Sequence, residues 1–365
     1  MWLGLVVYFA LLALRVTLNY SSLRHYLKLP LVERVTIAKR LPAVSIIVAA
    51  RNEESNLPRL LDSLNKLDYP EFDVIVVDDG SSDGTADVAR RYGAHVISVE
   101  GPPAGWTGKT FACWTGAREA AAEWLLFTDA ATVHGPTSLQ RILSFALEKQ
   151  VPGVSVFLQQ RVISFWERTL LPYASQQYFI GLSPGRVNET GNRQALANGQ
   201  YMLIQRQAYF RAGGHAAVRS AALDDVALAT HFKSQGVLLL AARAEREASV
   251  RMYTGLADIW AGLSRNAYAS IRFQGGSGVL TALGAILSAL AIPCLIYGLT
   301  TASPAFELAA LVTYLTATAE LFLWEWLFQA PITAALWQPL AATVFLAIAV
   351  DSAIRPKHKE KGRVV

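Results

Sequence analysis

Acidic side chains follow three short apolar segments of the chain. The segments span residues 44–50, 74–77 and 124–128, and the motifs at their ends are ARNEE (50–54), DDGSSDGT (78–85) and DAA (129–131). One such motif alone is typical of a turn or a helix N-cap, because Asp, Ser and Gly favour those positions. Three together are harder to explain as turns. Clustered carboxylates could accept hydrogen bonds from a ligand, act as a general base or help to hold a cation.

Two further motifs could take part in the same chemistry. Asp224 and Asp225 are adjacent carboxylates before the predicted helix 226–234, where they could cap the helix. Their like charges could also raise one pKa towards that of a general base. Lys109 opens another predicted helix within GWTGKT, and an ammonium beside free backbone N–H groups favours phosphate. The alternative for Lys109 is a solvated helix start.

The segments that must position these side chains alternate between two kinds. Short β-rich runs are predicted at 44–50, 74–77, 95–99 and 124–128, with helical stretches between them at 57–66, 85–92 and 109–122. This alternation predicts an α/β fold with a mainly parallel sheet and helices on both faces. Ligands of such sheets bind beyond the carboxyl ends of the strands, which is where the acids lie.

Several ordered motifs resemble one known family. VSIIVAARNEESNLPRLLDSL, VIVVDDGSSDGT and LLFTDAAT resemble the donor half of a family 2 glycosyltransferase with the GT-A fold, over about residues 43–275. GWTGKTFACWTGA (105–117), ANGQYMLI (197–204), GGHAAVR (213–219) and LDDVALA (223–229) narrow the resemblance to bacterial hopanoid-associated and carotenoid glycosyltransferases, and more distantly to ceramide glucosyltransferases.

The resemblance implies inverting transfer of a hexose from a nucleotide sugar, expected to be a UDP-hexose, to a hydroxyl of a membrane lipid. It makes Asp225 the general base and Asp224 the residue that orients it or the sugar. The residues implied for the donor are Ala50, Asn52, Glu53, Asp79, Lys109, Asp129 and Arg265. Those implied for the acceptor or sugar side are Trp106, Asn198, Gly199 and Gln200. For Trp106, packing in the core is an equal alternative.

The chain departs from the family pattern at two positions. The fourth strand of the family usually ends in Asp-x-Asp, but here Ala131 replaces the second acid, which commonly contacts a divalent cation. Mg²⁺ or Mn²⁺ held by Asp129 and the donor diphosphate stays compatible with the sequence, but a firmly held ion is not expected. His134 is a surface or structural residue on this view. The Gln-x-x-Arg-Trp segment of many relatives is also missing, and Arg265 is the alternative cation for the diphosphate or for a lipid headgroup.

The composition indicates that part of the chain lies in water and part in a membrane. The chain is 53% hydrophobic and 17% charged, against roughly 25% charged residues in soluble domains. No Lys or Arg occurs between Arg272 and Arg355. The low charge and abundant aromatic residues exclude intrinsic disorder, and two cysteines exclude a disulfide scaffold. A net charge of +5 without a long basic run indicates membrane-flanking residues and no nucleic-acid partner.

Apolar segments lie at both ends of the chain. We expect an uncleaved membrane anchor at 1–20, with Arg15 extended to the interface, followed by a basic juxtamembrane linker at 21–42. An amphipathic interfacial helix is expected at 251–277. In the C-terminal region, 278–352, we expect two or three spans from the stretches 279–299, 306–328 and 332–350. The middle stretch is the weakest candidate because it contains Glu307, Glu320 and Glu325.

These expectations describe an integral membrane protein whose catalytic domain, 43–250, faces the cytosol of a bacterial inner membrane. The positive-inside rule supports this orientation through the basic linker, although three C-terminal spans would put the basic tail, 353–365, outside. Two alternatives to a lipid glycosyltransferase stay open. A processive polysaccharide synthase would need a longer membrane region, and a non-catalytic relative is suggested only by Ala131.

Overall fold

The computed structural model describes residues 2–180, 186–192, 194–273, 276–327, 329–354, 359–360 and 363–364. The chain divides into two units. The helical unit comprises Met1–Lys28, Arg161–Gly185 and Tyr253–His358, and the sheet unit comprises Leu29–Gln160, Arg186–Met252 and Lys359–Val365.

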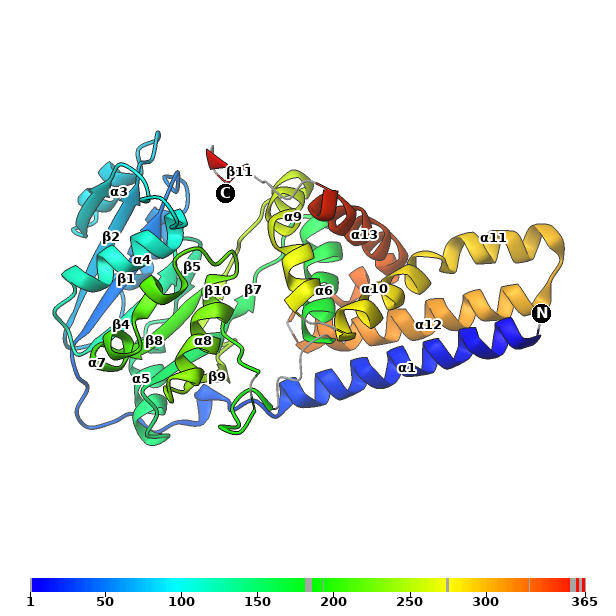
Figure 1. The fold of residues 1–365 in the computed structure, drawn as a ribbon, viewed down its shortest axis with the longest axis horizontal. Coiled ribbons are helices and arrows are strands. Elements are labelled where there is room, and N and C mark those ends of the chain that lie inside the picture. The colour runs from blue at the N-terminus through cyan, green and yellow to red at the C-terminus, as the bar shows by residue number, and fades with distance from the viewer. Residues whose placement is uncertain are drawn as a thin grey trace. The chain divides into compact units, whose positions relative to one another are not determined.

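The sheet unit is built on seven strands in the order β3-β2-β1-β4-β8-β6-β9 (Figure 1). β1 pairs in parallel with β2 and β4, whereas β8 runs antiparallel to its neighbours β4 and β6. The strands are β1 (Val44–Ala50), β2 (Phe72–Asp79), β3 (His95–Val99), β4 (Trp124–Asp129), β6 (Gly153–Phe157), β8 (Tyr201–Gln205) and β9 (Leu239–Arg243). The prediction of a parallel-dominated α/β sheet is therefore confirmed.

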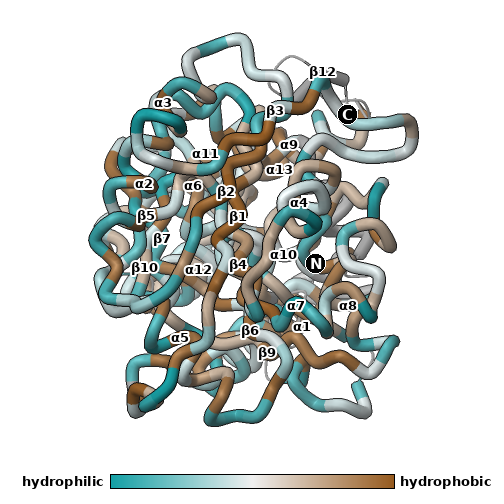
Figure 2. Tube along the Cα trace, turned by 90° about the vertical axis from the view of Figure 1, so that its left-hand side faces the viewer, coloured by the Kyte–Doolittle hydropathy of each residue, from teal (hydrophilic) through white to brown (hydrophobic). Residues whose placement is uncertain are grey.

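Helices cover both faces of this sheet, as predicted. Successive strand residues point to opposite faces, so Ile46 packs in one apolar core and Ile47 in the other. The first core is closed by α2 (Leu57–Leu64), α3 (Thr85–Arg91) and α5 (Ser138–Glu148). The second is closed by α4 (Gly108–Glu119), α7 (Arg206–Arg211) and α8 (Asp224–Ser234). Figure 2 shows β3, β2 and β1 as a hydrophobic band beside hydrophilic loops.

Shorter elements complete the sheet unit. A three-stranded sheet has the order β5-β10-β7, and β11 pairs with β12. The bounds of these elements are β5 (Thr132–His134), β7 (Gln159–Gln160), β10 (Ala248–Val250), β11 (Lys359–Glu360), β12 (Arg363–Val364), η1 (Val32–Arg34) and η3 (Gly214–Val218).

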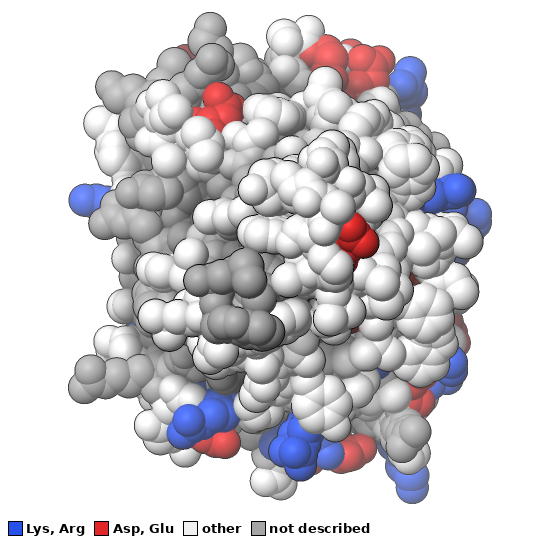
Figure 3. All heavy atoms as spheres, turned by 90° about the vertical axis from the view of Figure 1, so that its right-hand side faces the viewer, with Lys and Arg blue, Asp and Glu red and all other residues white. Residues whose placement is uncertain are grey.

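Long apolar helices make up the helical unit. They are α1 (Trp2–Leu27), α6 (Phe165–Ile180), α9 (Leu256–Phe273), α10 (Gly276–Ala289), α11 (Ala291–Thr301), α12 (Pro304–Leu327), η4 (Ile332–Trp337) and α13 (Gln338–Ile354). Figure 3 shows one face of the molecule as a largely uncharged surface with Lys and Arg at its rim. The exposed apolar side chains of α11 and α12 include Leu299, Leu308 and Leu315.

Among the described residues, three segments are long and apolar enough to cross a membrane: Val6–Leu27, Pro304–Leu327 and Ile332–Ile354. A fourth arises if Thr281–Ala289 and Ala291–Thr301, which meet at a bend of 41°, form one broken span. The expectation that the middle C-terminal stretch is the weakest candidate is therefore wrong. That stretch is the continuous helix α12, and the interruption lies in the stretch before it.

The acids of α12 explain this result, because two of them face protein. Glu320 forms a buried ion pair with Arg15 of α1, and Glu325 Oε2 accepts a hydrogen bond from the backbone N–H of Ala335 at 3.1 Å. A charge inside an apolar region is tolerated when it is paired. The expectation that Arg15 extends to the membrane interface is therefore wrong, since its guanidinium is buried between α1 and α12.

α9 confirms the helix predicted within 251–277, and its apolar side packs on protein. Ile259 is fully buried in a cluster with Leu170 of α6 and Ala342 of α13. The indole N–H of Trp260 donates to Asp351 Oδ2 at 3.0 Å. Amphipathic spacing shows which side of a helix is buried, but it does not show whether lipid or protein buries that side. The place of α9 at a membrane surface stays a prediction.

Candidate active site

The loops that follow β1 and β2 are joined by hydrogen bonds. Asn52 adopts a left-handed backbone conformation with φ of 52°, which Asn tolerates better than most residues. Its backbone N–H donates to Ser81 Oγ at 2.9 Å, and its Oδ1 accepts from the N–H of Ser82 at 2.8 Å. Glu53 Oε2 accepts from Asn56 Nδ2 at 2.7 Å. Asn52 and Glu53, both predicted donor residues, thus help to hold the rim, which is formed by the loops after β1 and β2 at the carboxyl edge of the sheet.

Asp79 ends β2 and lies against the first turn of α4. Its side chain is almost fully buried, and Arg51 Nη1 lies 3.9 Å from its Oδ2. Gly108 of α4 lies close to this carboxylate, since a Cβ placed there would lie 2.3 Å from Asp79 Oδ2. Thr107 caps the helix by accepting from the N–H of Thr110 at 3.2 Å. Ala50, at the end of β1, is buried in the first core and pairs with Asp78 of β2.

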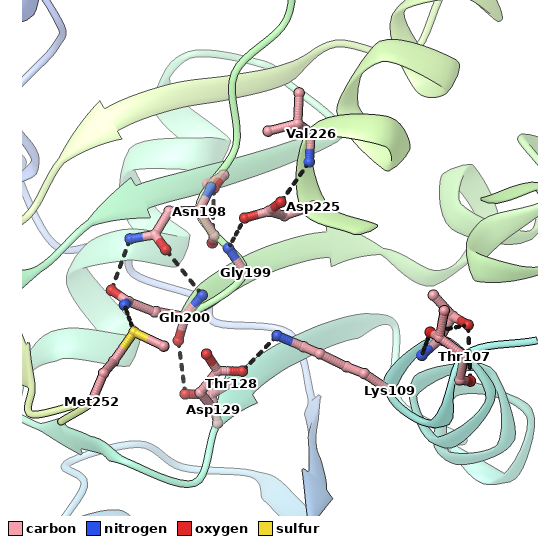
Figure 4. Close-up of polar contacts among 12 residues, drawn as sticks. Thr107, Lys109, Thr128, Asp129, Asn198, Gly199, Gln200, Asp225, Val226 and Met252 are labelled. Carbon is pink, nitrogen blue, oxygen red and sulfur yellow. Dashed lines mark hydrogen bonds and ion pairs between the residues drawn. The ribbon is translucent and has the colours of Figure 1, made fainter. Parts of the chain in front are cut away.

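Lys109 extends from α4 towards the end of β4. Its Nζ donates to Asp129 Oδ1 at 2.8 Å, and its side chain is 36% exposed (Figure 4). Burial by itself would lower the pKa of Lys109, but the carboxylates of Asp129 and Asp224 outweigh it and hold the pKa well above its usual range. Lys109 is therefore protonated near neutral pH and paired with Asp129, so the alternative of a solvated helix start does not describe it.

Asp225, at the start of α8, is held by two backbone donors. Its Oδ2 accepts from the N–H of Gly199 at 2.9 Å, and its Oδ1 from the N–H of Val226 at 2.8 Å. Burial and the neighbouring carboxylate of Asp224 raise its pKa from 3.8 to about 6, although Lys109 and the two backbone bonds oppose the rise. Within the described residues, the buried Oδ2 of Asp224 has no hydrogen-bond partner. An acid of this pKa suits a general base near neutral pH.

The turn before β8 presents Gly199 to Asp225. Asn198 Nδ2 donates to the carbonyl of Val156 at 3.3 Å and to Gln200 Oε1 at 3.0 Å. Gln200 Oε1 also accepts from Gln160 Nε2 at 3.1 Å, and Gln200 Nε2 lies 2.8 Å from Met252 Sδ. Figure 4 shows the contacts of Gln200 with Asn198 and Met252 on one side of Gly199 and Lys109 on the other. The amide side chains therefore fix the turn.

Trp106 lies in an aromatic cluster just before α4. Its ring centroid is 5.6 Å from that of Phe111 and 6.4 Å from that of Trp114. The ring is partly exposed, so it packs on aromatic residues while part of it stays accessible, and its role on the acceptor or sugar side stays a prediction.

The residues beside Asp129 do not form a firm metal site. No group of three His, Cys, Asp or Glu side chains is close enough to hold an ion in the described part of the chain. Ala131 packs against the first apolar core, and one oxygen of Asp129 is bonded to Lys109. His134 is buried, its Nε2 lies 3.1 Å from Thr128 Oγ1, and burial lowers its pKa to about 3. His134 is thus a structural residue in β5.

The structure brings most of the predicted site residues together in the sheet unit. The side chain of Arg265, in α9 of the helical unit, lies outside the described side chains. Sequence reasoning missed Gly108 and Arg51, both beside Asp79. Gly108 is the glycine directly before Lys109 in GWTGKT. A glycine at the start of a helix can indicate that another group approaches the backbone closely.

Comparisons with known proteins agree with this geometry. Residues 45–226 match the model of the family described as Glycosyl transferase family 2. A 4,4'-diaponeurosporenoate glycosyltransferase of Staphylococcus aureus (strain USA300) is 32% identical over 203 residues, which are 53% of this chain and 52% of the relative. The chain spans about half the length of the curated relatives it matches.

A solved structure shares the fold at low sequence identity. It is the mannosyltransferase PcManGT from Pyrobaculum calidifontis, in complex with GDP-Man and Mn²⁺. The TM-score is 0.58 at 19% identity, and the match covers 96% of this chain and 98% of that chain. The likeness supports a GT-A arrangement of the sheet unit.

Proposed function

Because residues 45–226 place the chain in glycosyl transferase family 2, we propose that it is a membrane-bound, inverting glycosyltransferase. It moves a hexose from a nucleotide sugar, expected to be a UDP-hexose, to a hydroxyl of a lipid. The observation that carries the proposal is the position of Asp225, a carboxylate of raised pKa, next to the Lys109–Asp129 pair at the carboxyl edge of the sheet.

The reaction needs a base on one side of the sugar and positive charge on the other. Asp225 takes the proton of the acceptor hydroxyl, whose oxygen forms a bond to the anomeric carbon while the bond to the diphosphate breaks. The negative charge that develops on the diphosphate is met by the ammonium of Lys109 and the N-terminal N–H groups of α4. Asp224, with a buried oxygen free of protein partners in the described residues, orients a sugar hydroxyl.

The donor and sugar residues follow from their positions. Asp79, beside Gly108, recognises the base edge, and the rim built on Asn52 and Glu53 encloses the nucleoside above Ala50. Asn198 and Gln200 act through the turn that presents Gly199. Trp106 offers part of its ring to the sugar or the acceptor. Arg265 is proposed as a second cation for the diphosphate.

A lipid acceptor is favoured by two features. Among the described residues, three helices, or four with the bent pair, have the length and composition of membrane spans, and a curated relative is named as a 4,4'-diaponeurosporenoate glycosyltransferase. We propose a hydroxyl of a hopanoid, carotenoid or sphingolipid-like lipid as the acceptor. The proposed place of the protein is the bacterial inner membrane.

The sheet unit is proposed to face the cytosol, where nucleotide sugars are made, because the basic residues after the first span favour that side. A tag inserted beside Arg186 of the sheet unit should be labelled in sealed inverted vesicles and protected in sealed right-side-out vesicles. Labelling from the outside alone would reverse the assigned topology.

The activity is tested by incubating membranes that contain the protein with labelled UDP- and GDP-hexoses, followed by mass analysis of extracted lipids. We expect one hexose added to an organic-soluble lipid. Label retained in a polymer would favour a processive synthase instead. Absence of product with every donor, from protein that still binds nucleotide, would favour a non-catalytic relative.

A further inference from the structure

We propose that the ammonium of Lys109 is the resident cation of Asp129, in the position where a divalent ion would otherwise sit. The inference deepens the proposed function and rests on it for the role of this cation towards the diphosphate. The site itself is defined by the protein alone, through the bond of 2.8 Å between Lys109 Nζ and Asp129 Oδ1.

Within the described residues, Asp129 belongs to no group of three His, Cys, Asp or Glu side chains that could hold a metal ion. Mg²⁺ and Mn²⁺ prefer several oxygen ligands in octahedral geometry. Asp129 is the acid at the end of β4, and the next position but one is Ala131, whose methyl group packs on the apolar core. One carboxylate that already accepts from an ammonium leaves a divalent ion with water alone for the rest of its coordination sphere.

The ammonium is held in place from several elements. Lys109 is the second residue of α4, whose start is capped by Thr107. A Cβ at Gly199 would lie 3.2 Å from Lys109 Nζ and 3.5 Å from Asp225 Oδ2, so the backbone of the turn before β8 closes on both groups. A cation bound at Asp129 would share this space with the ammonium, and two positive groups repel each other strongly at such a separation.

Two substitutions separate the contributions of charge and ligand number. Ala131→Asp adds the missing carboxylate while Lys109 stays in place, and Lys109→Met removes the ammonium while the chain length is kept. If the ammonium competes with metal, neither change alone creates a tight site, whereas Lys109→Met with Ala131→Asp does. Lys109→Arg is the matched control that keeps the positive charge.

The experiment is a titration of the full-length, nucleotide-free protein with Mn²⁺ alone, followed by the loss of the free Mn²⁺ resonance. For the wild type and Lys109→Arg we expect any Mn²⁺ binding at Asp129 to have a Kd above about 1 mM. Binding at Asp129 is identified by its loss in Asp129→Asn. The double variant should bind Mn²⁺ at least about tenfold more tightly than Ala131→Asp alone. Circular dichroism checks that each variant is folded.

Two results would overturn the proposal. One is a micromolar Mn²⁺ site in the wild type that is lost on Asp129→Asn. The other is an Ala131→Asp variant that binds Mn²⁺ as tightly as the double variant, since the ammonium would then exclude nothing. If the variants with Lys109→Met do not fold, a micromolar Mn²⁺ site in Ala131→Asp would still overturn the proposal, because this variant retains Lys109.

A second measurement separates this inference from the proposed function. Binding of UDP and GDP to the wild type is compared in chelator and in Mg²⁺, and we expect less than about a threefold difference, with a loss of about tenfold or more for Lys109→Met in chelator. Loss of nucleotide binding in chelator would contradict the role of Lys109 as the cation. If neither nucleotide binds under either condition, the proposed donor is wrong, while the Mn²⁺ titration still decides the nature of the site.

Discussion

Transfer should fall steeply as the pH is lowered below about 6, because the proposed base, Asp225, must be ionised to accept a proton. Burial and the charge of Asp224 raise its pKa from 3.8 to about 6. At about 1.4 kcal/mol for each pH unit, this change disfavours the carboxylate by about 3 kcal/mol in the free protein. At pH 5 only about one-tenth of the molecules would carry the ionised base.

The assay is the pH dependence of kcat/KM for lipid glycosylation, since this quantity reports the free enzyme. We expect the logarithm of kcat/KM to rise with a slope of one up to a midpoint near pH 6. Asp224→Asn removes the like charge beside Asp225 and should move this midpoint to lower pH. A midpoint near 4 in the wild type, or a midpoint that does not move in Asp224→Asn, would refute the assignment of Asp225.

Other substitutions test separate parts of the account. Asp225→Asn should lower turnover by about 10²–10⁴-fold and leave UDP affinity, measured by calorimetry, nearly unchanged; an equal loss of both would point to a structural role. Asp79→Ala should weaken UDP binding before it affects turnover, and Gly108→Ala should do the same because its methyl group would collide with the Asp79 carboxylate; unchanged affinity in both would remove Asp79 from the donor site. Arg15→Met or Glu320→Leu alone should destabilise the protein by about 3–5 kcal/mol, whereas the pair together should recover most of the loss in thermal unfolding; equal melting temperatures of all variants would show that the ion pair contributes nothing.

The fold of the sheet unit was predictable because local patterns specify it. The apolar run at Val44–Ala50 reads as a strand and becomes β1, and the acids that follow β1, β2 and β4 meet at one edge because those strands pair in parallel. Parallel pairing converts equivalent positions along the sequence into neighbours in space. The strand β8 was not anticipated, and its antiparallel pairing with β4 and β6 cannot be read from its local apolar run.

The contacts that define the site depend on long-range packing and were less visible. Lys109 and Asp129 are 20 residues apart, and neither local composition nor spacing indicates that the ammonium faces that carboxylate. The left-handed conformation of Asn52 likewise arises from its bond to the loop after β2. In each case the decisive partner lies on another element.

In the apolar helical unit, too, the sequence alone did not reveal a long-range contact. Glu320 was expected to weaken a span, because a lone acid in lipid is unfavourable. Its partner, Arg15, lies 305 positions away in the chain, and the pair turns two unfavourable charges into a contact between α1 and α12. Composition describes the average environment of a segment, whereas pairing depends on which helices lie side by side.

The anomeric configuration of the product tests the central claim most directly. Direct displacement by an acceptor hydroxyl, deprotonated by Asp225, inverts the anomeric centre. From an α-linked nucleotide hexose we predict a β-glycoside of the lipid. The configuration is identified by nuclear magnetic resonance of the purified glycolipid, from the one-bond coupling between the anomeric carbon and its proton. A product that retains the α configuration would contradict a single displacement and with it the role assigned to Asp225.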